Sequence, residues 1–190
     1  MSDAPLRALG IAGSLRKGSF NRALLRAAHE LKPEGLEIDD FEIGAIPLYD
    51  GDVEDKGDPE PVAAFKKAVQ SADAILIATP EYNYGVPGVL KNAIDWVSRP
   101  IPGTKTRVLN QKPAAILGAS QGSMGTVRAQ SALRQTFQFT QTLVMLQPEV
   151  LVALAQTKFD AEGRLTDEPT REVLKKFLAA FLAWSRRMKG

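Results

Sequence analysis

The chain has 190 residues, of which 44% are apolar and 24% charged, and its formal net charge is +2. This composition is typical of a globular protein with an ordinary core, and a charge so close to neutral disfavours nucleic-acid and membrane-surface partners. The absence of cysteine excludes a disulfide framework, a thiol nucleophile and a thiolate metal site. No apolar leader precedes Leu9 and no apolar run is long enough to cross a membrane, so we expect a cytoplasmic protein.

Apolar runs alternate along the chain with segments of helical periodicity. The run at 74–78 is apolar throughout, as in central parallel strands that are buried on both faces. Pro61 fits the first position of a helix, and Asp167 or Thr170 fits the N-cap of the last one. In chain order we predict a strand at 6–12, a helix at 21–31, a strand at 36–41, a long loop at 44–59, a helix from 61, a strand at 74–78, a helix at 88–98, a strand at 114–118, a helix at 126–140, a strand beginning at 143–146, an irregular or hairpin excursion at 157–165 and a final helix.

Five strands separated by helices predict one α/β domain over residues 1–190, built on an open, doubly wound parallel sheet. In such sheets the ligand binds outside the carboxyl ends of the strands, where the strand order reverses. Three loops of unusual composition follow the first, third and fourth strands. We therefore expect the functional site to lie among these three loops.

The first loop, residues 13–21, joins a buried strand to a helix and is rich in glycine and serine. Free backbone N–H groups and the helix dipole favour an anion at such a helix start. Ser14, Ser19 and Asn21 can add side-chain donors, and Arg16 adds a full charge. The loop is neither a Walker A sequence nor a GxGxxG fingerprint, and it suits one phosphate monoester better than a polyphosphate. The alternative is an ordinary Gly-Ser loop with a solvent-exposed arginine.

The second and third loops carry groups that suit a planar heterocycle. The second, residues 79–88, holds two tyrosines between prolines that stiffen it, so that its backbone can meet a ring edge and Tyr82 a ring face. The third, residues 118–125, has three glycines that permit close approach of the backbone to a ligand. The alternatives are a proline-rich connector with packed tyrosines and a flexible turn before a helix.

Taken together, the loops resemble the NADPH-dependent FMN reductase family of flavodoxin-like proteins, which includes quinone reductases and chromate-reducing flavoproteins. The resemblance extends from Leu6 to about Gly163. The family often has paired glycines where this chain has Gly125-Thr126. The motifs that carry the resemblance are Gly13-Ser14-Leu15-Arg16-x-x-Ser19-x-Asn21 and Pro80-Glu81-Tyr82-Asn83-x-x-x-Pro87-Gly88-x-Leu90-Lys91-Asn92-Ala93-x-Asp95-Trp96.

The resemblance implies a flavodoxin-like five-stranded sheet in the order 2-1-3-4-5 with helices on both faces. It implies bound FMN, NADPH or NADH as co-substrate, and ping-pong transfer to quinones or other small acceptors such as chromate. It also implies a homodimer or homotetramer with the flavin near a subunit interface. The cofactor-binding residues it implies are Gly13, Ser14, Leu15, Arg16, Ser19, Phe20 and Asn21 around the phosphate, and Pro80, Glu81, Tyr82, Asn83, Gly85, Ser120, Gln121 and Gly122 around the ring.

No side chain is assigned a catalytic role, because a flavin itself supplies the hydride chemistry. Glu81 is expected to act structurally or at the ring edge, with a general base as the alternative. His29 is expected to be a surface or helix-packing residue. Several helical cations are expected to be solvated, and others lie in a connector that the sequence does not place. The first group comprises Lys66, Lys67, Lys175, Lys176, Arg186 and Arg187, and the second, which holds candidates for an NADPH 2′-phosphate, comprises Arg99, Lys105 and Arg107.

Two other classes of protein remain open at this stage. A flavodoxin-type electron carrier would bind FMN without its own substrate turnover, but such carriers are usually strongly acidic so that they are steered to basic partners. A flavin-free receiver domain of the same topology needs clustered aspartates at its strand ends, where this chain has Thr79 and Ser120. NADPH consumption with a quinone separates the enzyme from the carrier, and an absorbance spectrum separates both from the receiver.

Overall fold

The computed structural model describes residues 4–189, and its centre is one parallel sheet in the order β2-β1-β3-β4-β5. This is the predicted order, and it is the flavodoxin-like arrangement. β1 and β3 pair along their length, for example Ala12 with Ala78, so that their carboxyl ends meet at one edge. The strands are β1 (Leu6–Ala12), β2 (Leu36–Phe41), β3 (Ala74–Ala78), β4 (Pro113–Ala119), β5 (Leu143–Val144) and β6 (Val150–Val152).

The fifth strand differs from the prediction, because two short pieces share its place beside β4. β5 pairs with the first residues of β4, and β6 pairs with its last residues. Pairing ends at Val144 and resumes at Val150, and Pro148, which has no N–H to donate to a strand ladder, lies in the gap between the two pieces. β6 therefore reaches the carboxyl edge, where it supports the loop after β4.

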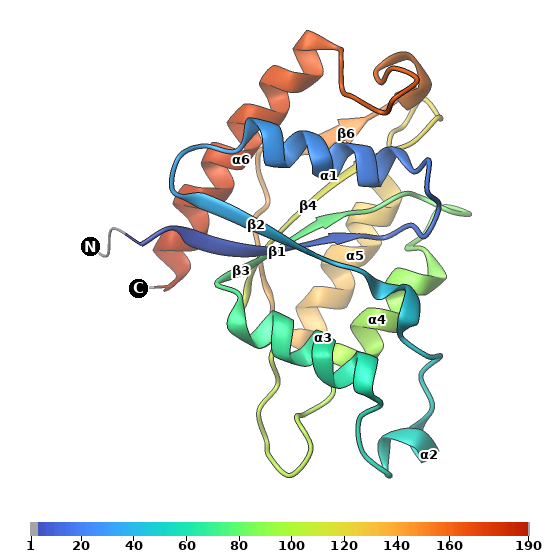
Figure 1. Cartoon of the computed structure of the whole chain (residues 1–190), viewed down its shortest axis with the longest axis vertical. Coiled ribbons are helices and arrows are strands. Elements are labelled where there is room, and N and C mark those ends of the chain that lie inside the picture. Colours follow the sequence, from blue (N-terminus) through green and yellow to red (C-terminus); the bar gives the residue numbers. More distant parts are fainter. Residues whose placement is uncertain (1–3, 190) are drawn as a thin grey trace.

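Helices cover both faces of the sheet (Figure 1). One core lies between the sheet and helices α1 and α6, and the other between the sheet and α3, α4 and α5. The predicted excursion at 157–165 is closed by an antiparallel bridge between Phe159 and Leu165, and Asp167 accepts a hydrogen bond from the N–H of Thr170 at the start of α6. The helices are α1 (Phe20–Leu31), α2 (Gly51–Glu54), α3 (Glu60–Ser71), α4 (Gly88–Val97), α5 (Val127–Thr140) and α6 (Glu168–Lys189), with short 3₁₀ turns at Ile43–Ala45 and Ala155–Thr157.

The segment predicted as a long loop after β2 contains α2 and contributes a buried ion pair. Lys66 of α3, predicted to be solvated, has a side chain that is only 4% exposed. Its ammonium donates to Asp58 at 2.7 Å and to the carbonyl of Pro100 at 3.0 Å. The prediction for Lys66 was wrong, because folding of the 44–59 segment brings a carboxylate over this side of the helix.

None of the helices within residues 4–189 combines the length and the apolar character that crossing a membrane requires.

Candidate functional site

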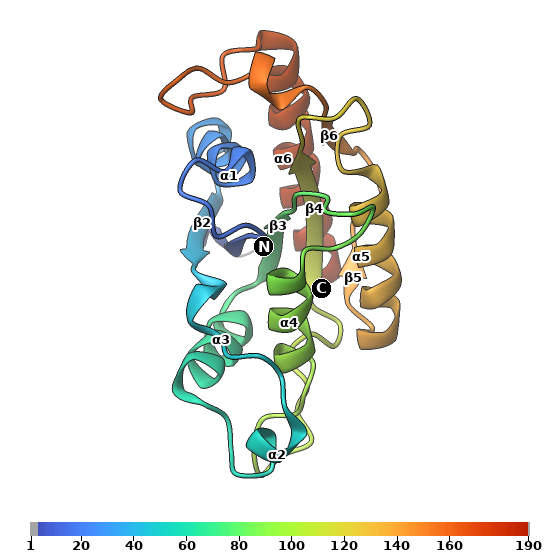
Figure 2. The same cartoon turned by 90° about the vertical axis from the view of Figure 1, so that its right-hand side faces the viewer.

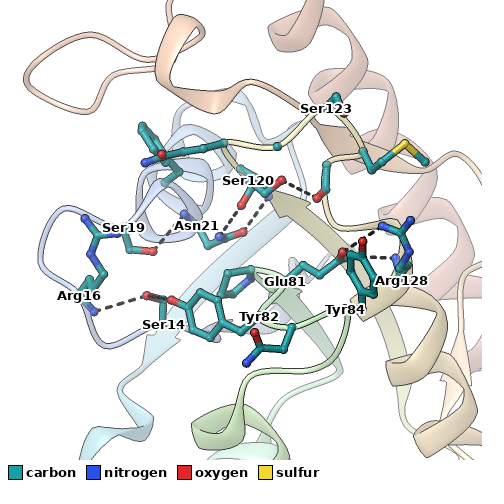
Figure 3. Close-up of a pocket in the computed structure, with 18 residues that line it drawn as sticks. Ser14, Arg16, Ser19, Asn21, Glu81, Tyr82, Tyr84, Ser120, Ser123 and Arg128 are labelled. Carbon is teal, nitrogen blue, oxygen red and sulfur yellow. Dashed lines mark hydrogen bonds and ion pairs between the residues drawn. The ribbon is translucent and has the colours of Figure 1, made fainter.

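The three predicted loops converge at the carboxyl edge of the sheet, which faces the viewer in Figure 2. They enclose a cavity of about 710 Å³, a volume within the usual range for small-molecule sites. The lining residues, many of which are drawn in Figure 3, are Ser14, Arg16, Ser19, Phe20, Asn21, Pro80, Glu81, Tyr82, Asn83, Tyr84, Ala119, Ser120, Gln121, Gly122, Ser123, Met124, Gly125 and Arg128.

The first loop forms an anion cradle at the start of α1. Ser19 is the N-cap, and its hydroxyl accepts hydrogen bonds from the N–H groups of Asn21 at 3.2 Å and Arg22 at 3.4 Å. Within residues 4–189, the N–H groups of Leu15 and Phe20 have no acceptor. Arg16 is exposed and has no acidic partner in the same described part of the chain. The donors and the charge therefore suit a phosphate.

Two side chains hold this loop in place. Arg22 donates from Nε to the carbonyl of Ser14 at 3.0 Å and pairs with Glu42. Asn21 is buried and bridges to the end of β4, where it donates to the carbonyl of Ala119 and accepts from its N–H, both at 2.9 Å. The Asn21 amide therefore joins the first and third loops as well as lining the cavity. Sequence reasoning missed Arg22, whose position in the first turn of a helix gave no signal.

The second loop is a tight hairpin turn that projects into solvent. Tyr82 and Gly85 exchange two backbone hydrogen bonds, of 3.0 and 3.2 Å. The two residues between them, Asn83 and Tyr84, have φ of 50° and 62°, as in a type I′ turn. Tyr82 reaches back to the first loop, where its hydroxyl lies 3.4 Å from that of Ser14 (Figure 3).

The Glu81 side chain has a structural contact, of the kind expected from the sequence, with a helix that the sequence did not identify. One carboxylate oxygen accepts hydrogen bonds from the N–H groups of Arg128 at 2.9 Å and Ala129 at 3.0 Å. The other oxygen lies 3.5 Å from the guanidinium of Arg128, and the Glu81 side chain is 9% exposed. A carboxylate at the positive end of a helix stabilises it, so the second loop caps α5.

The third loop is fixed to the end of β6 and to the segment that follows it. The N–H of Ser120 donates to Val152 at 2.9 Å, and the carbonyls of Ser120 and Gly122 accept from Ala155 and Leu154. The hydroxyl of Ser120 donates to the carbonyl of Gly125 at 2.5 Å, which closes the loop on itself. Gln121 and Gly122 stay exposed on the cavity side, where their backbone groups can meet a ligand edge.

Most of the predicted site residues line the cavity, but Gly13, Leu15 and Gly85 do not. A Cβ at Gly13 would lie 3.0 Å from Leu90, so this glycine lets the first loop pack against α4. Leu15 is about half exposed beside the cradle, and Gly85 closes the turn with Tyr82. The structure adds lining residues that the sequence did not single out, namely Tyr84, Ala119, Ser123, Met124, Gly125 and Arg128.

The other side chains considered from the sequence lie away from the cavity. Arg99 pairs with Glu54, and Arg107 donates to the carbonyl of Ser98, so neither reaches the site. Trp96 is fully buried and donates to the carbonyl of Pro47. His29 pairs with Asp40 on the outer side of α1. No lining residue is a histidine, and within residues 4–189 no cluster of His, Cys, Asp and Glu is placed to hold a metal.

The strand order, with an anion cradle after the first strand and a cavity lined by tyrosines beside it, defines a flavodoxin-like protein whose main pocket lies at the switch point of the sheet. Residues 6–157 match the family model described as NADPH-dependent FMN reductase. This chain belongs to that family.

Several known proteins are similar to this chain in sequence over nearly its whole length. An NAD(P)H-dependent FMN reductase of Pseudomonas aeruginosa is 50% identical over 190 residues, which cover 100% of both chains. A 2-hydroxy-1,4-benzoquinone reductase of a Burkholderia species is 43% identical over 176 residues, covering 93% of this chain and 94% of that one. The solved structure of the flavoenzyme NAD(P)H:(acceptor) oxidoreductase FerB of Paracoccus denitrificans superposes with a TM-score of 0.87 at 35% identity, covering 96% of this chain and 98% of that one.

Replacing Glu81 tests whether its carboxylate is a helix cap or a proton-transfer group. Glu81→Gln keeps an oxygen that can accept the two N–H hydrogen bonds but removes the negative charge at the start of α5, so we expect it to lower the free energy of unfolding by about 0.3–2 kcal/mol. With FMN bound, we expect turnover to fall only modestly, since the carboxylate is already engaged with the start of α5. Urea unfolding and NADPH–quinone assays measure the two effects. A thousandfold loss of turnover at full FMN occupancy would make Glu81 a proton-transfer residue instead.

Proposed function

We propose that this protein is an FMN-dependent NAD(P)H oxidoreductase that reduces quinones or other small acceptors, chromate among them, by ping-pong turnover. The observation that carries the proposal is one cavity that joins an anion cradle to two loops suited to a planar ring. Arg16, in the cradle, has no acidic partner within residues 4–189. When bound there, FMN supplies hydride acceptance from NAD(P)H and electron delivery to the second substrate.

The residues of the chain would divide this work among the three loops. The backbone N–H groups and Arg16 of the first loop would bind the phosphate, and Ser19 would orient the start of α1. Tyr82 and Pro80 would form one wall of the ring site, and Gln121 and Gly122 would meet its polar edge. Backbone dipoles held in fixed positions can stabilise developing charge without titrating.

Loss of the arginine in the cradle should affect the affinity for FMN but not for riboflavin, which lacks the phosphate. A charge-assisted hydrogen bond contributes roughly 1.5–3 kcal/mol. We therefore expect Arg16→Ala to weaken FMN binding about tenfold or more and to leave riboflavin binding unchanged. Fluorescence titration of the apoprotein with each flavin makes the comparison, and Arg187→Ala, an exposed arginine of α6, is the matched control. Equal loss for FMN and riboflavin contradicts the phosphate role.

The activity itself is tested with FMN-reconstituted protein, NADPH or NADH, and a set of quinones. Steady consumption of the nicotinamide with a quinone is the expected result. A protein that holds FMN but turns over none of these acceptors would instead fit an electron carrier. The same survey measures the preference between the two nicotinamides.

We also propose that the protein works as a homodimer or homotetramer in the cytoplasm, where its reductant is supplied. Apolar side chains at and beside the cavity rim support association: Leu15, Tyr82, Tyr84 and Met124 are each about half exposed or more. Light scattering at micromolar concentration should give at least twice the monomer mass of 20.6 kDa. A monomer with full activity would exclude an oligomer as the working form. Cell fractionation checks the compartment.

A further inference from the structure

The cavity carries positive charge in two separate places. Among its lining residues the cations are Arg16, in the first loop, and Arg128, in the first turn of α5. Figure 3 shows the two arginines on opposite sides of the site. Glu81 is the one lining acid, and one of its oxygens is occupied by backbone N–H groups of α5. In the proposed function the phosphate of FMN binds at Arg16, and no group of FMN is assigned to Arg128.

Arg128 is held more firmly than an ordinary surface arginine. Its guanidinium lies over the ring of Tyr84, 4.1 Å from the centroid, and 3.5 Å from a carboxylate oxygen of Glu81. Stacking on the face of an aromatic ring fixes the plane of a guanidinium. The side chain nevertheless remains 42% exposed. Within residues 4–189 its guanidinium makes no hydrogen bond, and its contact with Glu81 is an ion pair at Nη1 alone, so N–H donors of the fork remain available to a ligand.

The residue that carries the ring beneath Arg128, Tyr84, has a backbone conformation that bulky residues rarely adopt. Tyr84 has a φ of 62° in the left-handed region, which is strained for a side chain of this size. That backbone conformation belongs to the tight turn closed by Tyr82 and Gly85. Glu81, at the base of the same turn, ties it to the helix that carries Arg128. The turn and α5 thus present one flat, charged donor group to the cavity.

We infer that Arg128, seated on Tyr84, binds a phosphate group of the nicotinamide co-substrate. The inference rests on the proposed function, in which NAD(P)H enters a cavity that already holds FMN. A dinucleotide brings a pyrophosphate, and NADPH brings a 2′-phosphate as well, whereas a quinone brings no phosphate. A guanidinium fork matches the geometry of phosphate oxygens with two parallel hydrogen bonds. Arg128 is therefore a specificity-determining residue for the reductant and not for the acceptor.

The test compares Arg128→Gln with Arg187→Gln, which removes the same charge from an exposed position on α6. Calorimetric titration of FMN-loaded protein with oxidised NADP⁺ and NAD⁺ gives binding without turnover. Rapid-mixing reduction by NADPH and NADH then separates the apparent dissociation constant from the limiting rate. A second pair of variants, Tyr84→Phe and Tyr84→Ala, keeps or removes the ring beneath the guanidinium.

We expect Arg128→Gln to weaken dinucleotide binding at least tenfold, with FMN affinity and the limiting rate within about twofold of the wild type. A larger loss of affinity for NADP⁺ than for NAD⁺ assigns the contact to the 2′-phosphate. An equal loss of affinity for both assigns it to the pyrophosphate. Tyr84→Ala should share part of the loss, and Tyr84→Phe and Arg187→Gln should not. The wild-type affinity should fall with added salt more steeply than that of Arg128→Gln.

Dinucleotide affinities within twofold of the wild type in both the titration and the reduction experiment would overturn the inference and leave the proposed function intact. Failure of the wild-type protein to take up FMN, seen in its flavin absorbance before any dinucleotide is added, would instead overturn the proposed function and this inference with it.

Discussion

Lys66→Met should destabilise the protein by about 3–5 kcal/mol, the usual effect of removing one partner of a buried ion pair. The variant keeps the aliphatic stem but leaves the Asp58 carboxylate, whose side chain is 5% exposed, without its ammonium. It also removes the donor to the carbonyl of Pro100. For a chain of this length we expect the thermal midpoint to fall by roughly 6–20 °C.

Two further variants make this result specific. Lys67→Met changes an exposed lysine on the same helix and should alter the free energy of unfolding by less than about 0.5 kcal/mol. The double variant Lys66→Met with Asp58→Leu should recover most of the loss, because apolar side chains of similar volume often replace a buried pair without net cost. If the single and double variants unfold at the same midpoint, an unpaired carboxylate is not the cause of the loss.

The features that sequence predicted well are those that depend on near neighbours in the chain. Strand β3 is apolar throughout because both of its faces are covered, and the prediction for it agrees with its observed bounds, Ala74–Ala78. Asp167, one of the two residues predicted to cap the last helix, accepts a hydrogen bond from the N–H of Thr170 at the start of α6. The three loops could be assigned to one edge because parallel strands place their carboxyl ends together. Family resemblance then supplied the strand order and the kind of cofactor.

The features that sequence did not predict depend on contacts between distant segments. Lys66 looked solvated because Asp58, Pro100 and the helix meet only in the folded chain. Glu81 caps a helix 47 residues further on, and Arg128 reaches the cavity through that same contact. No periodicity or local motif encodes such pairs. The division of the fifth strand into β5 and β6 does have a local signal in the sequence, since Pro148 stands between the two pieces.

Gly118→Ala should both destabilise the protein and weaken its cofactor site. A Cβ at this position of β4 would lie 2.0 Å from Oγ1 of Thr126 and 2.4 Å from the carbonyl oxygen of Thr79. The second clash is with the backbone at the start of the second loop, so a change of side-chain rotamer cannot relieve it. Overpacking usually costs about 1–3 kcal/mol, and here we expect at least about 3 kcal/mol. Since the clash separates the second and third loops, FMN affinity should fall at least tenfold.

Gly88→Ala is the matched control, because a Cβ there meets nothing within 4 Å and the residue begins α4. It should be neutral or stabilising by up to about 1 kcal/mol. Thr126, which stands where the family often has a second glycine, gives a further test: Thr126→Gly removes the nearer clash, so adding it to Gly118→Ala should restore part of the stability and leave the clash with Thr79 in place. Urea unfolding and FMN titration of the variants measure both effects. A Gly118→Ala protein with the unfolding midpoint and FMN affinity of the wild type would show that the second and third loops do not need this close approach to form the site.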